Sequence, residues 1–317
     1  MSIVKNILFL FFILSTALGN AQTYAKNSID VEFQSGYVSG QTSEYVFEGD
    51  KCISRLDWDE NFCPYIGIIF KLNVYNILFD LGITNLIPEK SGKMRDYDFL
   101  ISGSNDISHF SEHDAYLDKH FTADAGVGYV FRISEILIVP LFGYEYQNRK
   151  WSAQDGYLQY PVDGSAWTGA EPAQGVSGTV ISYEQMFYSP RIGVELILNS
   201  KGVLSIALEF YVLPSLHVET MDSHFLRLKQ FYDVMDEGVA YKAGGGIIYH
   251  PSSNAENLFY KLQLSYEHYS AMKGTTSSGD IGISDGSLTN DDGYGAGMEA
   301  KLWDVSFSMI LKTNLID

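Results

Sequence analysis

Apolar residues alternate with small or polar ones along most of the chain, in runs separated by polar connections. Such a period of two is typical of β-strands, because successive side chains of an extended chain point to opposite faces. In most runs, aromatic or aliphatic residues occupy one parity, which predicts strands with one apolar face. The clearest runs are SIDVEFQSGYVSGQTSEYVFE, FTADAGVGYVF, ILIVPLFGYEYQNRKWSA, MFYSPRIGVELIL, VLSIALEFYVLPSLHVET, VAYKAGGGIIYH, LFYKLQLSYEHYS and GAGMEAKLWDVSFSMIL.

The connections between the runs distinguish a secreted β-sandwich from an outer-membrane barrel. Ten strands are predicted, and short links (NVYN, RISEI, NSKG, PSSNAEN) alternate with others, mostly long, at 47–51, 89–117, 154–178, 223–238 and 273–291. An even strand number, with tight turns at one rim and larger loops at the other, is typical of bacterial outer-membrane barrels. We therefore predict an all-β fold, a ten-stranded antiparallel transmembrane β-barrel with extended extracellular loops.

The first residues predict export from the cytoplasm. One lysine is followed by an apolar run over residues 7–18 and by small residues at Gly19 and Ala21. This order is typical of a secretory signal peptide, and the run is short for a membrane-spanning helix. We expect a signal peptide over residues 1–21 and one barrel domain over residues 22–317.

The net charge of −18 limits the partners. Nucleic acid and anionic lipid are poor partners for such a surface, whereas a cationic peptide would be attracted to it. Acidic residues also provide solubility, so charge alone does not establish a ligand.

The two cysteines, Cys52 and Cys63, are eleven residues apart in a chain expected to enter an oxidising compartment. A disulfide is the usual expectation there. If both lie on one strand, however, their separation of more than ~30 Å prevents a bond. We expect free cysteines.

Two short stretches contain candidate catalytic groups. Asp96 and Asp98 are two apart in KMRDYDFL, so on an extended chain their carboxylates share one face and titrate as a pair. Asp222 and His224 are spaced in the same way in HVETMDSHFLR, and a carboxylate so placed can orient an imidazole as a general base. Either stretch read alone is also compatible with an ordinary charged loop.

Together these stretches resemble the omptins, a family of outer-membrane endopeptidases, whose signature is Asp-x-Asp in the second outer loop and Asp-x-His at the top of strand seven. The resemblance extends over the mature chain, through SGQTSEYVF, ISRLDW, GYEYQNRKWSA and SYEQMFYSPRIG. It implies that a water molecule between the Asp96/Asp98 couple and His224, oriented by Asp222, attacks the scissile peptide bond. It also implies a site facing the cell exterior and peptide or protein substrates, with no nucleic acid; we expect a monomer.

The same resemblance assigns a substrate pocket. Glu44, Met94 and Ile181 match the pocket glutamate, methionine and isoleucine of the family, which prefers to cleave beside basic residues. Thr220 stands where a second pocket acid is usual, so one carboxylate is expected instead of two. A preference for cationic peptides is expected, but its strength at the cleaved bond depends on whether the neighbouring Glu219 compensates for Thr220.

Omptins also require lipopolysaccharide, and the basic residues that bind it are incomplete here. Lys150 with Tyr146 fits one position, but Met186 stands where an arginine is usual, and no lysine aligns near Met235. Fewer cations mean fewer charge-assisted bonds to an anionic lipid. We expect no cofactor, and weak or absent dependence on lipopolysaccharide.

Two other readings remain. HFSEH, residues 109–113, fits the H-x-x-E-H string of inverted zinc peptidases, which would need a helix over residues 106–121 begun by Asp106. Alternatively the barrel only binds, as an adhesin, because a fold does not fix a function.

Overall fold

The computed structural model describes residues 27–198, 203–251, 257–282 and 288–315, and most of them lie in β-strands. The expected signal peptide lies outside the described residues. Among those residues, no helix is long and apolar enough to cross a membrane.

Thirteen strands are described, most of them longer than 20 residues. They are β1 (Ser28–Glu48), β2 (Lys51–Val74), β3 (Ile77–Leu86), β4 (Glu89–Asp98), β5 (His109–Tyr129), β6 (Phe131–Ile133), β7 (Ile136–Gln159), β8 (Gln174–Gly175), β9 (Thr179–Leu198), β10 (Leu204–His224), β11 (Lys229–Tyr249), β12 (Leu258–Asp280) and β13 (Thr289–Asn314).

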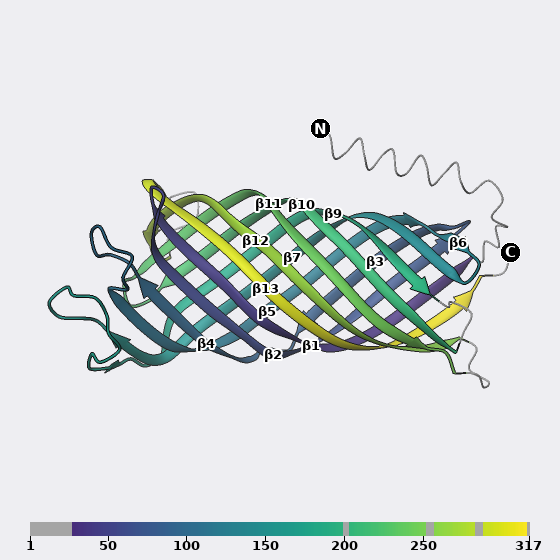
Figure 1. The fold of residues 1–317 in the computed structure, drawn as a ribbon, viewed down its shortest axis with the longest axis horizontal. Helices are drawn as coiled ribbons and strands as arrows, with labels where there is room; N and C mark the ends of the chain where they lie inside the picture. The colour runs from purple at the N-terminus through teal and green to yellow at the C-terminus, as the bar shows by residue number, and fades with distance from the viewer. Residues whose placement is uncertain (1–26, 199–202, 252–256, 283–287, 316–317) are drawn as a thin grey trace.

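These strands form one closed antiparallel barrel (Figure 1). β3 and β4 together make a single barrel strand between β2 and β5, and β6 continues β5 along the edge of β7. The ring closes because β1 pairs with both β2 and β13, and β5 pairs with β7. With the short β8 set aside, ten barrel strands remain among the described residues, so the predicted all-β barrel is confirmed.

The outer surface carries the apolar belt that the alternation predicted. In β3, Leu78 and Asp80 face inward, whereas Ile77, Phe79 and Leu81 are exposed. Exposed aliphatic and aromatic side chains continue this belt on the other strands, for example Phe142, Ile192, Ile206, Leu208, Phe210, Leu262, Leu264, Val305 and Phe307. An apolar band outside a closed barrel is the surface that a lipid bilayer requires.

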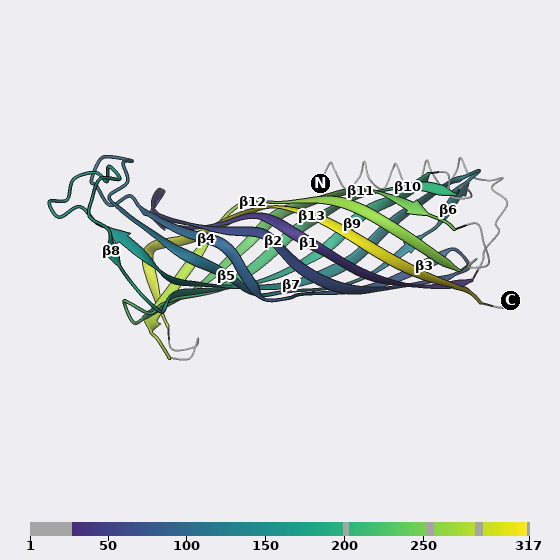
Figure 2. The same ribbon diagram turned by 90° about the horizontal axis from the view of Figure 1, so that it is seen from below.

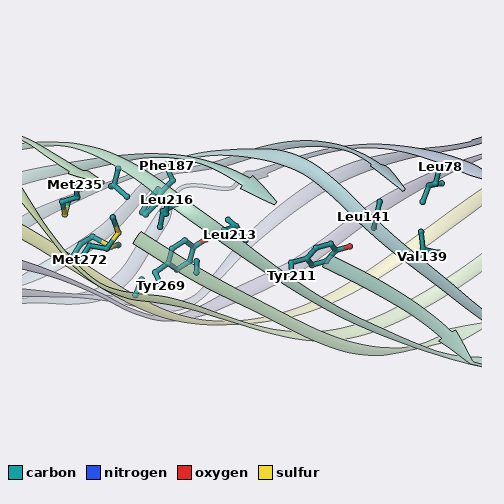
Figure 3. Packing of buried hydrophobic residues seen from close by; sticks show 14 of the residues in the cluster. Leu78, Val139, Leu141, Phe187, Tyr211, Leu213, Leu216, Met235, Tyr269 and Met272 are labelled. Carbon is teal, nitrogen blue, oxygen red and sulfur yellow. The ribbon is translucent and has the colours of Figure 1, made fainter. Parts of the chain in front are cut away.

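The interior combines ion pairs with buried apolar side chains. Arg191 makes ion pairs with Asp80 and Asp124 at 2.5 and 2.8 Å, so the guanidinium is compensated by two carboxylates. Figure 3 shows the apolar part, distributed along the barrel from Met235 and Met272 to Leu78 and Val139. These side chains and ion pairs fill much of the barrel interior.

The two ends of the barrel differ. At the turn end, β2 and β3 are joined by Tyr75 and Asn76, both with positive φ, as a type I′ hairpin requires. The start of β1 and the end of β13 also lie on this side (Figure 1). At the loop end, residues 99–108 and 160–178 form the longest connections, and Figure 2 shows β4, β5 and β8 extending away from the yellow-green ends of β12 and β13.

The loop-end connections are shorter than the sequence predicted. β4, β5 and β7 continue through much of the expected loops 89–117 and 154–178, and β11 and β12 do the same for 223–238 and 273–291. The reason is cross-strand pairing on the outer face. Arg95 contacts Asp59 and Glu112 at 3.2 Å, and Lys93 contacts Asp114 at 2.9 Å, which stabilises these strands beyond the apolar belt.

Cys52 and Cys63 both lie on β2 and are free. Their position on one strand is the arrangement that the spacing argument assumed, and an extended strand keeps their sulfur atoms far apart.

Candidate active site

Asp96 and Asp98 lie at the loop end of β4, next to β2. Because they are two apart on a strand, both carboxylates point inward, with only 7% and 8% of each residue exposed. Ser54 on β2 lies opposite Asp98 in the register, and its hydroxyl donates a hydrogen bond of 3.0 Å to Asp96 Oδ1. The two aspartates therefore form a buried pair rather than a solvated charge.

Asp222 and His224 end β10. Asp222 is buried, and its Oδ2 lies 2.5 Å from His224 Nε2. With Nε2–H donating to the carboxylate, Nδ1 carries the lone pair and is the nitrogen that can accept a proton. This is the arrangement of a histidine oriented by a carboxylate for general-base chemistry.

One cavity of about 290 Å³ brings the two pairs together. β1, β2, β4, β10, β11 and β13 all contribute to its walls. The lining residues include the four candidate catalytic side chains, with Glu44, Ser54, Arg227, Phe231, Asp233, Thr276 and Tyr294. A peptide bond entering from the loop end would reach carboxylates on one wall and an imidazole on the other.

Burial and mutual repulsion raise the pKa values of the aspartate pair. Burial, together with the neighbouring Asp98, raises the pKa of Asp96 to about 7. The pKa of Asp98 is also raised, chiefly by burial. Near neutral pH Asp96 is therefore partly protonated, so the pair can both accept hydrogen bonds from a water molecule and donate them to it.

Two opposing effects act on the pKa of His224. Burial disfavours the imidazolium, but the Asp222 carboxylate outweighs it, so the pKa of His224 is raised above the ordinary value of 6.5. Asp96 contributes in the same direction, so the aspartate pair lies close enough to His224 for their charges to interact.

The acidic part of the cavity contains a residue that the sequence did not identify. Glu44 is 3% exposed, and Thr220 is fully buried on β10. Directly across the register, on β11, stands Asp233, whose Oδ2 accepts a 2.7 Å hydrogen bond from the Thr220 hydroxyl. A second carboxylate is thus present beside Thr220, supplied by the neighbouring strand.

Met94 and Ile181 do not line this cavity. Both are buried in the cluster of apolar side chains beneath and beside it. Its centre is an aromatic layer of Trp58, Trp151 and Tyr183, with ring centroids 5.9–6.2 Å apart. Met94 lies opposite Trp58 in the strand register, so it stands next to this aromatic layer.

The helix over residues 106–121 that the zinc-peptidase reading requires is absent, because residues 109–121 lie in β5. His109 and His113 lie on β5, where residues four apart are about 13 Å from one another, too far to share one metal ion. His113 instead contacts Asp155 O and Ser111 Oγ. Within the described part of the chain, no group of three or more histidine, cysteine, aspartate or glutamate side chains is arranged to hold a metal.

Sequence reasoning missed Ser54, Asp233, Arg227 and Tyr160. Tyr160 follows β7, and its pKa is raised by burial and, to a smaller extent, by the charges of Asp96 and Asp98. These residues are scattered over four connections or strands, and only the register of the barrel brings them to the site. Asp233 alone had a signal, since an inward-facing acid in an apolar alternating run is unusual.

Comparison with known proteins identifies relatives at the level of family and fold. A sequence model of the omptin family matches residues 25–309. No curated protein sequence matches significantly. The crystal structure of the outer membrane protease OmpT from Escherichia coli superposes with a TM-score of 0.81 at 17% identity, covering 93% of this chain and 100% of that one. The outer membrane protein OprG from Pseudomonas aeruginosa gives a TM-score of only 0.41 at 8% identity, covering 93% of this chain and 100% of that one.

Replacing Asp222 by asparagine is expected to lower the pKa of His224 below 6.5, because burial then acts without the carboxylate that opposes it. NMR titration of labelled histidines in detergent micelles measures this. His217, whose Nδ1 lies 2.6 Å from Asp236 on another part of β10 and β11, is the internal reference and should not change. An unchanged His224 pKa in this variant would contradict the described pairing.

Proposed function

The chain belongs to the omptin family, and on that premise we propose that it is an outer-membrane endopeptidase that hydrolyses peptide bonds with an activated water molecule. Family and fold together support an outer-membrane protease. The finer assignment, to Asp96, Asp98, Asp222 and His224 as catalytic residues, rests on one observation. These four side chains line the same cavity, from β4 on one side and β10 on the other.

The proposed reaction needs no acyl-enzyme. Water lies between the aspartate couple and His224, and Nδ1 of His224 takes one proton as the water oxygen attacks the scissile carbonyl carbon. Asp222 stabilises the imidazolium that forms. The couple holds the water in position, and its shared proton passes to the leaving amine when the carbon–nitrogen bond breaks. The products are a carboxylic acid and an amine.

We further propose that the cavity faces the cell exterior and takes cationic peptide segments. The loop end extends beyond the apolar belt through strands whose outer faces carry ion pairs, as suits an aqueous environment. Glu44 and Asp233 provide two carboxylates for a basic side chain. Burial, with Asp222, Asp233 and Asp96 nearby, raises the pKa of Glu44 well above its usual range, so a bound cation would favour its ionisation.

We also propose that activity does not depend on lipopolysaccharide. On the outer face, Lys150 lies opposite Glu184 in the register, with Nζ 3.5 Å from the carboxylate, and Lys119 approaches the same carboxylate at 3.8 Å. An acid between two lysines reduces the positive potential that an anionic headgroup would meet.

Replacing His224 by alanine, or Asp96 by asparagine, should lower kcat/KM for peptide cleavage by about 10²–10⁴-fold, the usual contribution of a positioned base. Cleavage of a fluorogenic peptide by refolded protein measures this. His217→Ala is the matched control, because His217 also pairs with an aspartate but lies outside the cavity. Undiminished cleavage by the His224 variant would refute the assignment, as would loss of wild-type cleavage on adding a zinc chelator.

Asp233→Asn should lower kcat/KM about 10–100-fold for peptides with arginine or lysine at the cleaved bond, since a charge-assisted hydrogen bond contributes about 1.5–3 kcal/mol. The same peptides with a neutral residue there should be much less affected. Burial raises the pKa of Asp233 to about 6, so the wild-type preference for cations should also weaken below that pH. In the Thr220→Asp/Asp233→Thr variant the carboxylate returns to β10, and the preference should recover. Equal losses on both peptides would count against a substrate-binding role.

Protein refolded in detergent without lipopolysaccharide should cleave peptides, and adding the lipid should change kcat/KM by no more than a few-fold. Lys150→Ala should then leave cleavage unaltered in the presence or absence of the lipid. A strict requirement for added lipopolysaccharide would show that the cations paired with Glu184 still bind it.

A further inference from the structure

The connection between β10 and β11 places an arginine at the mouth of the cavity. Arg227 lies three residues after His224, and its backbone N–H donates a hydrogen bond of 3.2 Å to the His224 carbonyl oxygen. Its side chain lines the cavity. Among the lining residues that the structure describes, it is the only lysine or arginine. A single permanent cation therefore stands beside five acidic side chains, those of Glu44, Asp96, Asp98, Asp222 and Asp233.

Arg227 is held in place from another wall of the site. Its guanidinium interacts with Tyr160, the first residue after β7, and opposes the rise that burial causes in the pKa of that phenol. The ring of Tyr160 packs edge-on against His109 on β5, with centroids 4.6 Å apart. His109 in turn lies opposite Asp98 in the β4–β5 register. Tyr160 and Arg227 thus link the connections after β7 and β10 above the aspartate pair.

The guanidinium acts on the pair electrostatically. Arg227 opposes the effect of burial on Asp98 and lowers its pKa more than any other neighbour does. Arg227 also lowers the pKa of Asp96. It lowers the pKa of His224 as well, because a nearby cation disfavours the protonated imidazole. All three effects favour the state in which the couple has an ionised carboxylate and the imidazole is neutral.

We propose that Arg227 is a positioning residue for the hydrolysis proposed above, acting through the Asp96/Asp98 pair, and that Tyr160 holds its guanidinium over that pair. The role rests on the proposed function. The cation keeps one carboxylate of the pair ionised in a cavity that would otherwise favour two neutral carboxylic acids. The water molecule then meets a charged acceptor on one side and a neutral imidazole on the other.

Other ionisable groups face the pair from the surrounding elements. None of them is a permanent cation, so none can replace Arg227 at neutral and alkaline pH. They are Glu44 on β1, His109 on β5, Tyr160 after β7, Asp222 and His224 on β10, Asp233 on β11 and Tyr294 on β13.

The test compares the pH dependence of kcat/KM for peptide cleavage by wild type, Arg227→Gln, Arg227→Lys and Tyr160→Phe. Removing the cation raises the pKa values of the couple and of His224, so the acidic limb of the Arg227→Gln profile should move up by about 0.5–1 pH unit. Activity should then fall about 3–10-fold near pH 6 and little above pH 8. The acidic limb of Arg227→Lys should lie close to that of wild type, because the cation is retained. In Tyr160→Phe the limb should move up by less than in Arg227→Gln.

Arg55→Gln is the matched control, because Arg55, on β2, lies over the ring of Tyr97, on β4, but does not line the cavity. Its profile should coincide with that of wild type. A loss in Arg227→Gln that is equal at every pH, or an Arg227→Lys variant as defective as Arg227→Gln, would overturn the proposal.

Titration of His224 by NMR separates this proposal from the proposed function. In Arg227→Gln the pKa of His224 should rise, whether or not the protein cleaves the chosen peptide. If wild type cleaves no peptide but His224 responds in this way, the endopeptidase assignment fails and the electrostatic role of Arg227 stands. If His224 does not respond, the proposal for Arg227 fails.

Discussion

The site depends on the burial of like charges at one end of a closed barrel. Several carboxylates share a cavity of about 290 Å³, which raises the pKa of Asp96 to about 7 and that of Asp233 to about 6. An open sheet would relax to separate or solvate these groups, whereas a ring in which every barrel strand is paired on both sides resists that movement. Proton-transfer groups with separated pKa values are the usual basis of acid–base catalysis in one site.

The long strands explain how such a site can lie beyond the part of the barrel that contacts lipid. Below it, the exposed face is aliphatic and aromatic, and the interior contains the Arg191 ion pairs and a buried apolar cluster. Above the belt, Arg95 and Lys93 pair with acids on neighbouring strands. The catalytic candidates therefore sit on paired strands rather than on loops, and the stacked rings of Trp58 and Tyr183 lie on β2 and β9, which pair with β4 and β10.

Much of the fold could be predicted because alternation reports directly on which face of a strand meets lipid. The loop lengths could not, because cross-strand ion pairs such as Arg95–Glu112 extend strands through sequence that is locally polar. Asp96, Asp98, Asp222 and His224 could be identified because each pair is close in sequence. Asp233 and Arg227 could not be assigned, because their relation to Thr220 and to the aspartate pair arises from strand register and a four-residue connection. Similarly, the H-x-x-E-H string at residues 109–113 does not form the motif of a zinc peptidase, because these residues lie in a strand and not in a helix.

The central claim is that the aspartate couple on β4 faces the imidazole on β10 across one cavity. The most direct measurement is the pKa of His224, by NMR titration, in Asp96→Asn compared with wild type. Because Asp96 favours the imidazolium, the pKa of His224 should be lower in Asp96→Asn than in wild type. The pKa of His224 should not change in Asp57→Asn, because the Asp57 carboxylate accepts a hydrogen bond from Ser43 outside the cavity. If the pKa of His224 is the same in Asp96→Asn and in wild type, the aspartate pair on β4 does not face the imidazole on β10, and the proposed site is contradicted.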